Sequence, residues 1–157
     1  MRRRTGIDAA MFIKNYTSGV PVPKTVSRIE ELLAKIGAKA IGKDYKDSKV
    51  VSITFQLEIN GQDHLVRLPA NPNAIFDCLR KQVRRPHNGT LERLRDQAER
   101  TAWKLQQDWL EVELTNIHMN QKHPLQCFLA YIWDGQRTYF DVLQANQFKA
   151  LPESVAS

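Results

Sequence analysis

The dipeptide Asn60-Gly61 constrains the fold of this chain more than any other feature of its sequence. Apolar and polar residues alternate on both sides of it, over residues 50–59 and 62–69. Such alternation is typical of strands with one buried face, and Asn-Gly supplies the two positive φ angles of a two-residue hairpin turn. The sequence therefore predicts a tight antiparallel β-hairpin at this point.

The two-residue turn also sets the register of the hairpin, because it determines which residues face each other. We expect Phe55 opposite Val66 on the buried face, and Thr54 opposite Arg67 on the exposed face. A weaker strand pattern over residues 38–45 precedes the hairpin. Together these segments predict a three-stranded antiparallel sheet.

Helices are expected before and after this sheet. Residues 25–36 carry apolar side chains at three- and four-residue spacing, with Thr25 or Ser27 as the cap. Gly37 follows where a helix commonly ends in the left-handed conformation. Asn71-Pro72 then starts a second helix, because an Asx cap followed by proline in the first turn is a helix-start signal.

The C-terminal half of the chain is expected to be helical. Pro86 interrupts the second helix, and Thr90 caps a long helix over residues 90–119. Two short helices are expected over residues 124–150, the second with a capping box at Thr138. The predicted fold class is α+β: a helix, a three-stranded antiparallel sheet, then a long helix and short C-terminal helices.

The length of 157 residues corresponds to one domain, and an apolar fraction of 42% is that of a globular protein. We predict an extended basic arm over residues 1–24, a single α+β domain over residues 25–150 and a disordered tail over residues 151–157. The absence of a signal-peptide segment and of a long apolar run favours a cytoplasmic location, where both cysteines are reduced. Cys78, which follows Phe76 and precedes Leu79, is expected to be a buried thiol.

Basic charge is concentrated in the middle of the chain. Residues 80–104 hold eight Lys/Arg and three Asp/Glu, whereas residues 105–157 hold three and six. A local positive field favours a polyanionic partner, DNA or RNA. Four-residue spacing would place the first four of these side chains in two rows on one helix. The residues predicted to bind nucleic acid are Arg80, Lys81, Arg84, Arg85, Arg93, Arg67 and, in the arm, Arg2, Arg3 and Arg4. The alternative is a solvated helix face, since acidic residues are interspersed along the long helix.

Catalytic motifs are absent from the sequence: it contains no phosphate-binding glycine loop, no GxSxG and no HExxH. We therefore expect a protein without enzymatic activity, cofactor or metal. A metal-dependent nuclease stays as an alternative, and its candidate carboxylates are Asp44, Asp47, Glu58 and Asp63. A metal site at three other residues fits no familiar zinc spacing; these residues are His118, His123 and Cys127.

Several short stretches occur in an order that resembles a family of small uncharacterised proteins encoded by bacteriophages and prophages. They are Arg67-Leu68-Pro69-Ala70-Asn71, Gln97-Ala98-Glu99-Arg100-Thr101-Ala102-Trp103, Asp108-Trp109 and Phe128-Leu129. The resemblance covers about residues 15–150, and it departs from the family at Lys104, where arginine is expected. The resemblance implies the cytoplasm of a bacterial host cell, a mobile element, and a role in DNA metabolism or interference with host defence. The family has no established active site, so it assigns no functional residue.

Charge and resemblance together predict a nonenzymatic nucleic-acid-binding accessory protein of a phage or prophage, for example one that binds or anneals single strands. The alternative is a phage-encoded inhibitor that binds a host or defence nucleoprotein complex, as anti-CRISPR proteins do. The length of the predicted helix over residues 90–119 also suggests a homo-oligomer, because such a helix exceeds what a small sheet can cover. No membrane partner is expected.

Overall fold

A computed structural model describes residues 14–155, which form two compact units. The first unit comprises the residues up to Leu32 together with Ala70–Val112, and the second comprises Leu33–Pro69 together with the residues from Glu113 onward. Each unit is therefore built from two stretches that lie far apart in the sequence. The predicted α+β class is confirmed.

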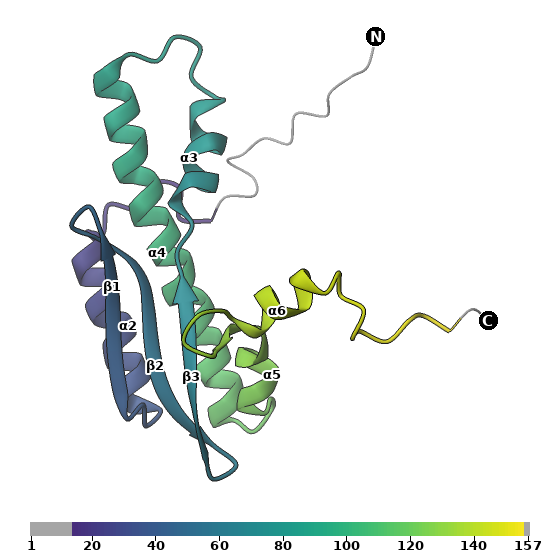
Figure 1. Cartoon of the computed structure of the whole chain (residues 1–157). Helices are drawn as coiled ribbons and strands as arrows, with labels where there is room; N and C mark the ends of the chain where they lie inside the picture. Colours follow the sequence, from purple (N-terminus) through teal and green to yellow (C-terminus); the bar gives the residue numbers. More distant parts are fainter. Residues whose placement is uncertain (1–13, 156–157) are drawn as a thin grey trace. The chain divides into compact units, whose positions relative to one another are not determined.

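The second unit contains an antiparallel sheet with strand order β1-β2-β3-β4 (Figure 1). The predicted hairpin forms between β2 and β3, with Phe55 opposite Val66 and Thr54 opposite Arg67. Its turn residues have φ angles of 52° at Asn60 and 78° at Gly61. The four strands are β1 (Ala40–Lys46), β2 (Lys49–Ile59), β3 (Gln62–Pro69) and β4 (Ile132–Trp133).

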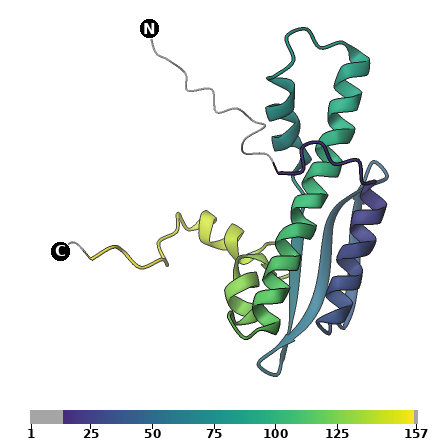
Figure 2. The same ribbon diagram turned by 180° about the vertical axis from the view of Figure 1, so that it is seen from behind.

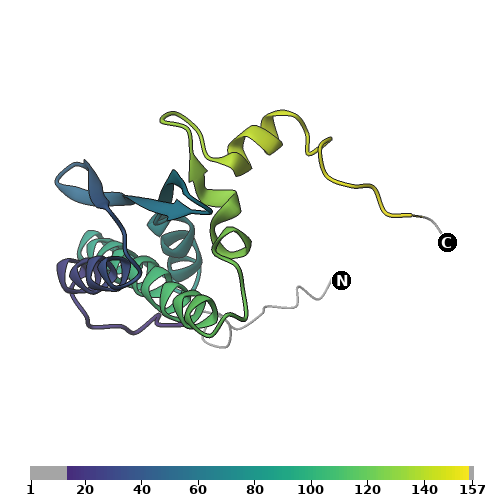
Figure 3. The same cartoon turned by 90° about the horizontal axis from the view of Figure 1, so that it is seen from below.

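The fourth strand corrects the predicted three-stranded sheet. β4 lies beside β3 and pairs Val66 with Ile132 and Leu65 with Trp133 (Figure 3). The first of the two predicted C-terminal helices is accordingly short. The segment contains α5 (Pro124–Phe128), the 3₁₀ turn η1 (Leu129–Tyr131) and, after β4, the helix α6 (Tyr139–Ala145). Two residues of strand carry no visible alternation, so only the pairing with β3 reveals this strand.

The apolar core of the second unit joins the sheet to α5. Phe55 and Phe128 are 1% and 0% exposed, and their rings meet edge to face with centroids 5.5 Å apart. Ile53, Val66 and Leu68 are also buried. Burial of these side chains supplies the main stabilising free energy of the unit, about 1.5–3 kcal/mol for each. Phe128 thereby fixes the start of the segment that continues into β4.

The first unit contains a helical hairpin formed by α3 (Pro72–Arg80) and the first part of α4 (Asn88–His118) (Figure 1). The side chain of Asn71 accepts a hydrogen bond from the N–H of Ala74, so the predicted cap of α3 is confirmed. Within the hairpin, the Arg95 guanidinium lies 5.0 Å from the centre of the Phe76 ring. This cation–π contact links the two helices.

The segment before α2 (Val22–Lys35) crosses α4 within the first unit (Figure 2). The Thr101 hydroxyl donates a hydrogen bond to the carbonyl oxygen of Asn15 over 3.0 Å. The Arg100 Nε donates to the carbonyl oxygen of Ser18 over 3.1 Å. Of the predicted extended arm, residues 14–20 are thus attached to α4. Arg2, Arg3 and Arg4 lie outside the described residues.

Two predicted helix caps are wrong, because both helices begin before the residues that were expected to cap them. α2 begins at Val22, and the carbonyl oxygen of Pro21 accepts the hydrogen bond from the N–H of Thr25, which lies inside the helix. α4 begins at Asn88, and the N–H of Thr90 donates to Nδ1 of His87. Only His87 therefore takes the side-chain capping role that was predicted, in place of Thr90; the Pro21 bond is an ordinary main-chain bond of the first helical turn.

Candidate nucleic-acid interface

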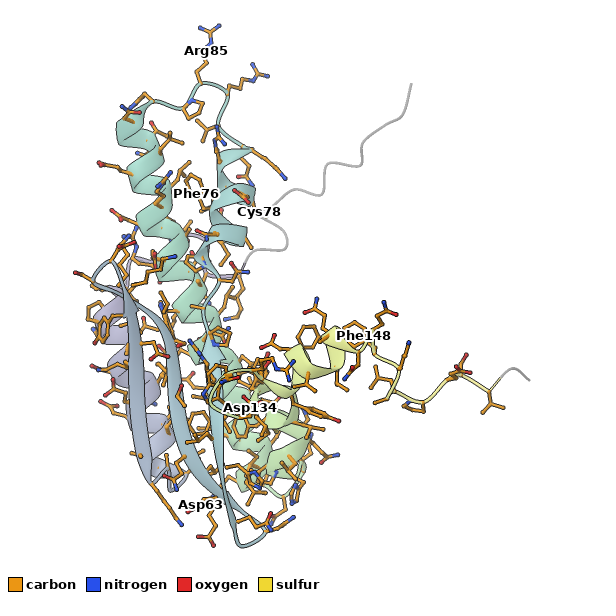
Figure 4. All side chains as sticks on the ribbon, viewed as in Figure 1. Asp63, Phe76, Cys78, Arg85, Asp134 and Phe148 are labelled. Carbon is orange, nitrogen blue, oxygen red and sulfur yellow. The ribbon has the colours of Figure 1, made fainter. Side chains whose placement is uncertain are left out.

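Four of the predicted phosphate-binding side chains lie at one end of the helical hairpin. Arg80 is the last residue of α3, Lys81 follows as its C-cap, and Arg84 and Arg85 lie in the connection to α4. Figure 4 shows Arg85 at the end of this connection, with its side chain directed away from the helices. We call these four residues the basic tip.

The prediction that the basic tip forms two rows on one helix is wrong. α3 ends at Arg80, and the chain continues through turns in which the N–H of Gln82 bonds to the carbonyl of Leu79 and that of Val83 to Arg80. Pro86 then disfavours helical geometry at the residue before it. The four cations are consequently clustered around a turn rather than aligned along a helix.

The charge of the basic tip is not compensated within the described part of the chain. Arg80, Lys81, Arg84, Arg85 and Arg93 are all exposed, and within residues 14–155 none of them forms an ion pair. Other cations of the first unit do have partners, for example Lys104, whose Nζ lies 3.6 Å from Asp108. Repulsion among clustered cations is relieved when an anion binds, which favours a polyanionic ligand here.

A small cavity of about 370 Å³ adjoins the basic tip. It is lined by Asp77, Arg80, Lys81, Val83 and Pro86. Arginine can hold two phosphate oxygens at once and lysine adds a point charge, so this lining suits a single phosphate group. Asp77 places one negative charge in the same wall, which favours a phosphodiester over a dianionic monoester.

Arg67 belongs to the second unit, and its guanidinium already has partners there. Its Nη2 lies 3.2 Å from Asp44, its Nε donates to the Ser52 hydroxyl over 3.2 Å, and its Cζ lies 4.3 Å from the centre of the Trp133 ring. The four residues come from the four strands, so this chain of contacts crosses the whole sheet. Arg67 is therefore a half-buried structural cation, in contrast to the exposed cations of the basic tip.

A second cavity, of about 530 Å³, lies beside Arg67 in the second unit. The aromatic side chains of Tyr131, Trp133 and Phe140 contribute to its lining. Sequence reasoning missed this cavity, because these residues approach Arg67 only through the pairing of β3 with β4. No signal near Trp133 in the sequence indicates that pairing.

Three of the four carboxylates considered for a nuclease are paired with cations, and the fourth, Asp47, lies in the turn between β1 and β2 with a φ of 51°. Lys39 Nζ lies 2.7 Å from Asp63 and 2.8 Å from Glu58. The hydrogen bonds that Lys39 donates to Asp63 and then to Glu58 raise its pKa to about 12, and the same lysine lowers the pKa of Asp63. Asp44 is bound by Arg67. Asp63 lies near the far end of the β2–β3 hairpin (Figure 4). Over residues 14–155 no group of three or more His, Cys, Asp or Glu could hold a metal ion.

Two of the three residues considered as metal ligands, Cys127 and His123, have structural roles in the second unit. The Cys127 thiol donates to Glu113 over 2.8 Å, and Lys122 Nζ lies 3.0 Å from the same carboxylate. Burial and then the Glu113 carboxylate raise the pKa of Cys127 to about 12, so the thiol stays protonated. His123 caps α5, with Nδ1 accepting from the N–H of Leu125. A protonated thiol is neither a nucleophile nor a metal ligand.

Cys78 is exposed, so the prediction of a buried thiol is wrong. Leu79 is the buried residue of α3, and Phe76 contacts Arg95 of α4. Apolar neighbours in the sequence do not bury a residue of a helix, because adjacent positions point in directions about 100° apart. Cys78 is labelled in Figure 4.

Comparison with protein-family models, curated proteins and solved structures finds no match to this chain. The resemblance to phage and prophage proteins therefore stays a prediction. None of the helices described over residues 14–155 is long and apolar enough to cross a membrane.

Proposed function

We propose that this protein is a nonenzymatic nucleic-acid-binding protein whose basic tip contacts the phosphate backbone. One observation carries the proposal: Arg80, Lys81, Arg84 and Arg85 are clustered, exposed and without ion pairs among residues 14–155. Such a cluster has a strong affinity for polyanions because binding releases condensed counterions. A phage or prophage accessory protein that binds or anneals single strands is the concrete form.

Salt dependence measures the number of phosphates that the basic tip neutralises. Four contacts predict a slope of log K against log salt of about −3 for a single strand and about −3.6 for a duplex. Arg93 on α4 would steepen the slope by roughly one unit if it also contacts the backbone. Fluorescence anisotropy with labelled single-stranded and duplex DNA and RNA, at several salt concentrations, gives this slope directly.

A matched pair of variants tests the assignment to the basic tip. The first carries Arg80→Ala, Lys81→Ala, Arg84→Ala and Arg85→Ala. The control removes four exposed lysines elsewhere, Lys24→Ala, Lys35→Ala, Lys46→Ala and Lys149→Ala, so both variants have the same net charge. We expect the first to lose most of its affinity and salt dependence, and the control to keep most of both. Equal losses in the two variants, or a wild-type protein that binds neither DNA nor RNA, would overturn the proposal.

A protein partner is the second candidate, in the form of an inhibitor that binds a host or defence nucleoprotein complex. The observation that favours it is the exposure of apolar side chains after α6, at Phe148, Leu151 and Val155. Phe148 is visible on this segment in Figure 4. Affinity purification from a bacterial lysate treated with nuclease distinguishes the two functions. A stoichiometric protein partner that remains bound supports the inhibitor, and loss of all bound material supports nucleic-acid binding.

A further inference from the structure

The cavity beside Arg67 in the second unit has the size of a ligand site, at about 530 Å³. Three kinds of group meet in it: aromatic rings, a planar cation and hydrogen-bonding side chains. We call it the aromatic hollow. The residues of its lining that matter here are Arg67, Tyr131, Trp133, Gln136, Phe140 and Asp141.

One side of the aromatic hollow includes Gln136 and Thr138, and hydrogen bonds hold the turn that carries them. Asp134 Oδ1 accepts hydrogen bonds from the N–H groups of Gln136 and Arg137 over 2.8 and 2.7 Å, and these bonds lower the pKa of Asp134. Gly135, with φ of 100°, allows the tight turn. The predicted capping box of Thr138 and Asp141 then begins α6. The site is preformed, which reduces the entropy lost on binding.

Flat surfaces dominate the aromatic hollow. The guanidinium of Arg67 lies over the Trp133 ring at 4.3 Å from its centre, and Asp44 and Ser52 hold it in that orientation. Its third nitrogen, Nη1, has no partner in the part of the chain that the structure describes. Phe140 is 47% exposed at the same site. Aromatic rings and arginine planes are the surfaces on which unpaired bases stack.

Hydrogen-bonding groups make the aromatic hollow suitable for a heterocycle rather than for a purely apolar side chain. Gln136 offers both a donor and an acceptor, and Asp141 Oδ1 can accept a bond while Oδ2 caps α6. A nucleobase edge likewise carries donors and acceptors, so it can bond to these two side chains. A base can enter such a site only when it is unstacked.

We propose that the aromatic hollow binds an unpaired nucleobase, so that the ligand of this protein is a single-stranded nucleic acid. The proposal rests on the proposed function for its ligand class, but it concerns a different surface. The basic tip contacts phosphates in any nucleic acid, whereas the aromatic hollow distinguishes a strand with accessible bases from one without them.

The test compares two single-stranded oligonucleotides of equal length and equal phosphate number, one of normal nucleotides and one built only from abasic sites. We expect the normal strand to bind about tenfold more tightly, since stacking of one base contributes about 1–3 kcal/mol. If neither strand binds, the proposed function fails, and this inference fails with it. If both bind equally, the inference alone is overturned and the proposed function stands.

Variants then locate the base. Phe140→Ala and Gln136→Ala change exposed side chains of the aromatic hollow. Trp133→Phe is a conservative change that tests the contribution of the indole ring on β4. The control is Tyr45→Ala, which removes an aromatic side chain on β1 that is 60% exposed. We expect the hollow variants to reduce the preference for the normal strand at least several-fold while the affinity for the abasic strand is unchanged. A preference that survives Phe140→Ala and Gln136→Ala overturns the proposal, as does an equal loss in Tyr45→Ala.

Discussion

The edge-to-face contact between Phe55 and Phe128 should couple the sheet to α5, and a double-mutant cycle measures that coupling. Both rings are almost fully buried, with centroids 5.5 Å apart and an interplanar angle of 80°. Aromatic pairs of this geometry contribute about 0.5–1.5 kcal/mol beyond the area they bury. Phe55→Leu and Phe128→Leu should each lower the free energy of unfolding by about 1–2 kcal/mol. The double variant should lose less than their sum by about 1 kcal/mol.

Urea unfolding followed by circular dichroism gives these free energies from the transition midpoints. The control is Leu129→Ala, next to Phe128 in the chain but 49% exposed, which should change the free energy of unfolding by less than about 1 kcal/mol. The reasoning is refuted if the losses of Phe55→Leu and Phe128→Leu sum to the loss of the double variant within about 0.3 kcal/mol. The segment leading to β4 would then be held by something other than this aromatic pair.

Three further predictions concern the two units. In the native protein a thiol reagent should modify Cys78 rapidly and Cys127 only on unfolding, because Cys78 is exposed and burial raises the pKa of Cys127 to about 12. Rapid modification of a Cys78→Ser variant would contradict this prediction. Hydrogen bonds from the Cys127 thiol and Lys122 lower the pKa of Glu113 in the folded state. The ionised carboxylate therefore stabilises the fold above about pH 4.5, and this stabilisation is lost as the pH falls through the pKa of Glu113 in the folded protein. In Glu113→Gln, the urea midpoint should change less with pH over that range than it does in the wild type. A pH dependence equal to that of the wild type contradicts the pairing of Glu113 with Cys127 and Lys122. Arg67→Lys should lower the free energy of unfolding by about 1 kcal/mol, since lysine cannot both stack on Trp133 and bond two partners, whereas Arg85→Lys should have no measurable effect.

Local sequence patterns predicted the parts of the fold that depend on neighbouring residues. The Asn60-Gly61 turn determined the register of β2 and β3, including the placement of Arg67 opposite Thr54. The cap of α3 at Asn71 and the capping box at Thr138 were also predicted correctly. Each of these features depends on turn chemistry or on hydrogen bonds within three residues, which explains why the sequence alone sufficed.

Errors arose where the outcome depends on distant residues or on competing local partners. His87 capped α4 in place of Thr90, because a histidine nitrogen can accept the same hydrogen bond as a hydroxyl. α3 ended before Lys81, so the predicted rows of cations became a cluster around a turn. The exposure of Cys78 depends on which face of α3 meets α4, and its own neighbours do not determine that.

By itself, the sequence determined the hairpin, the helix order and the concentration of positive charge over residues 80–104, because period, turn residues and charge are local properties. Tertiary structure alone decided the fourth strand and the partners of Arg67. Pairing of β4 with β3 brings Trp133 to a guanidinium that β1 and β2 hold from the other side. Contacts of this kind join segments far apart in the chain, and their free energy depends on packing that no short stretch of sequence contains.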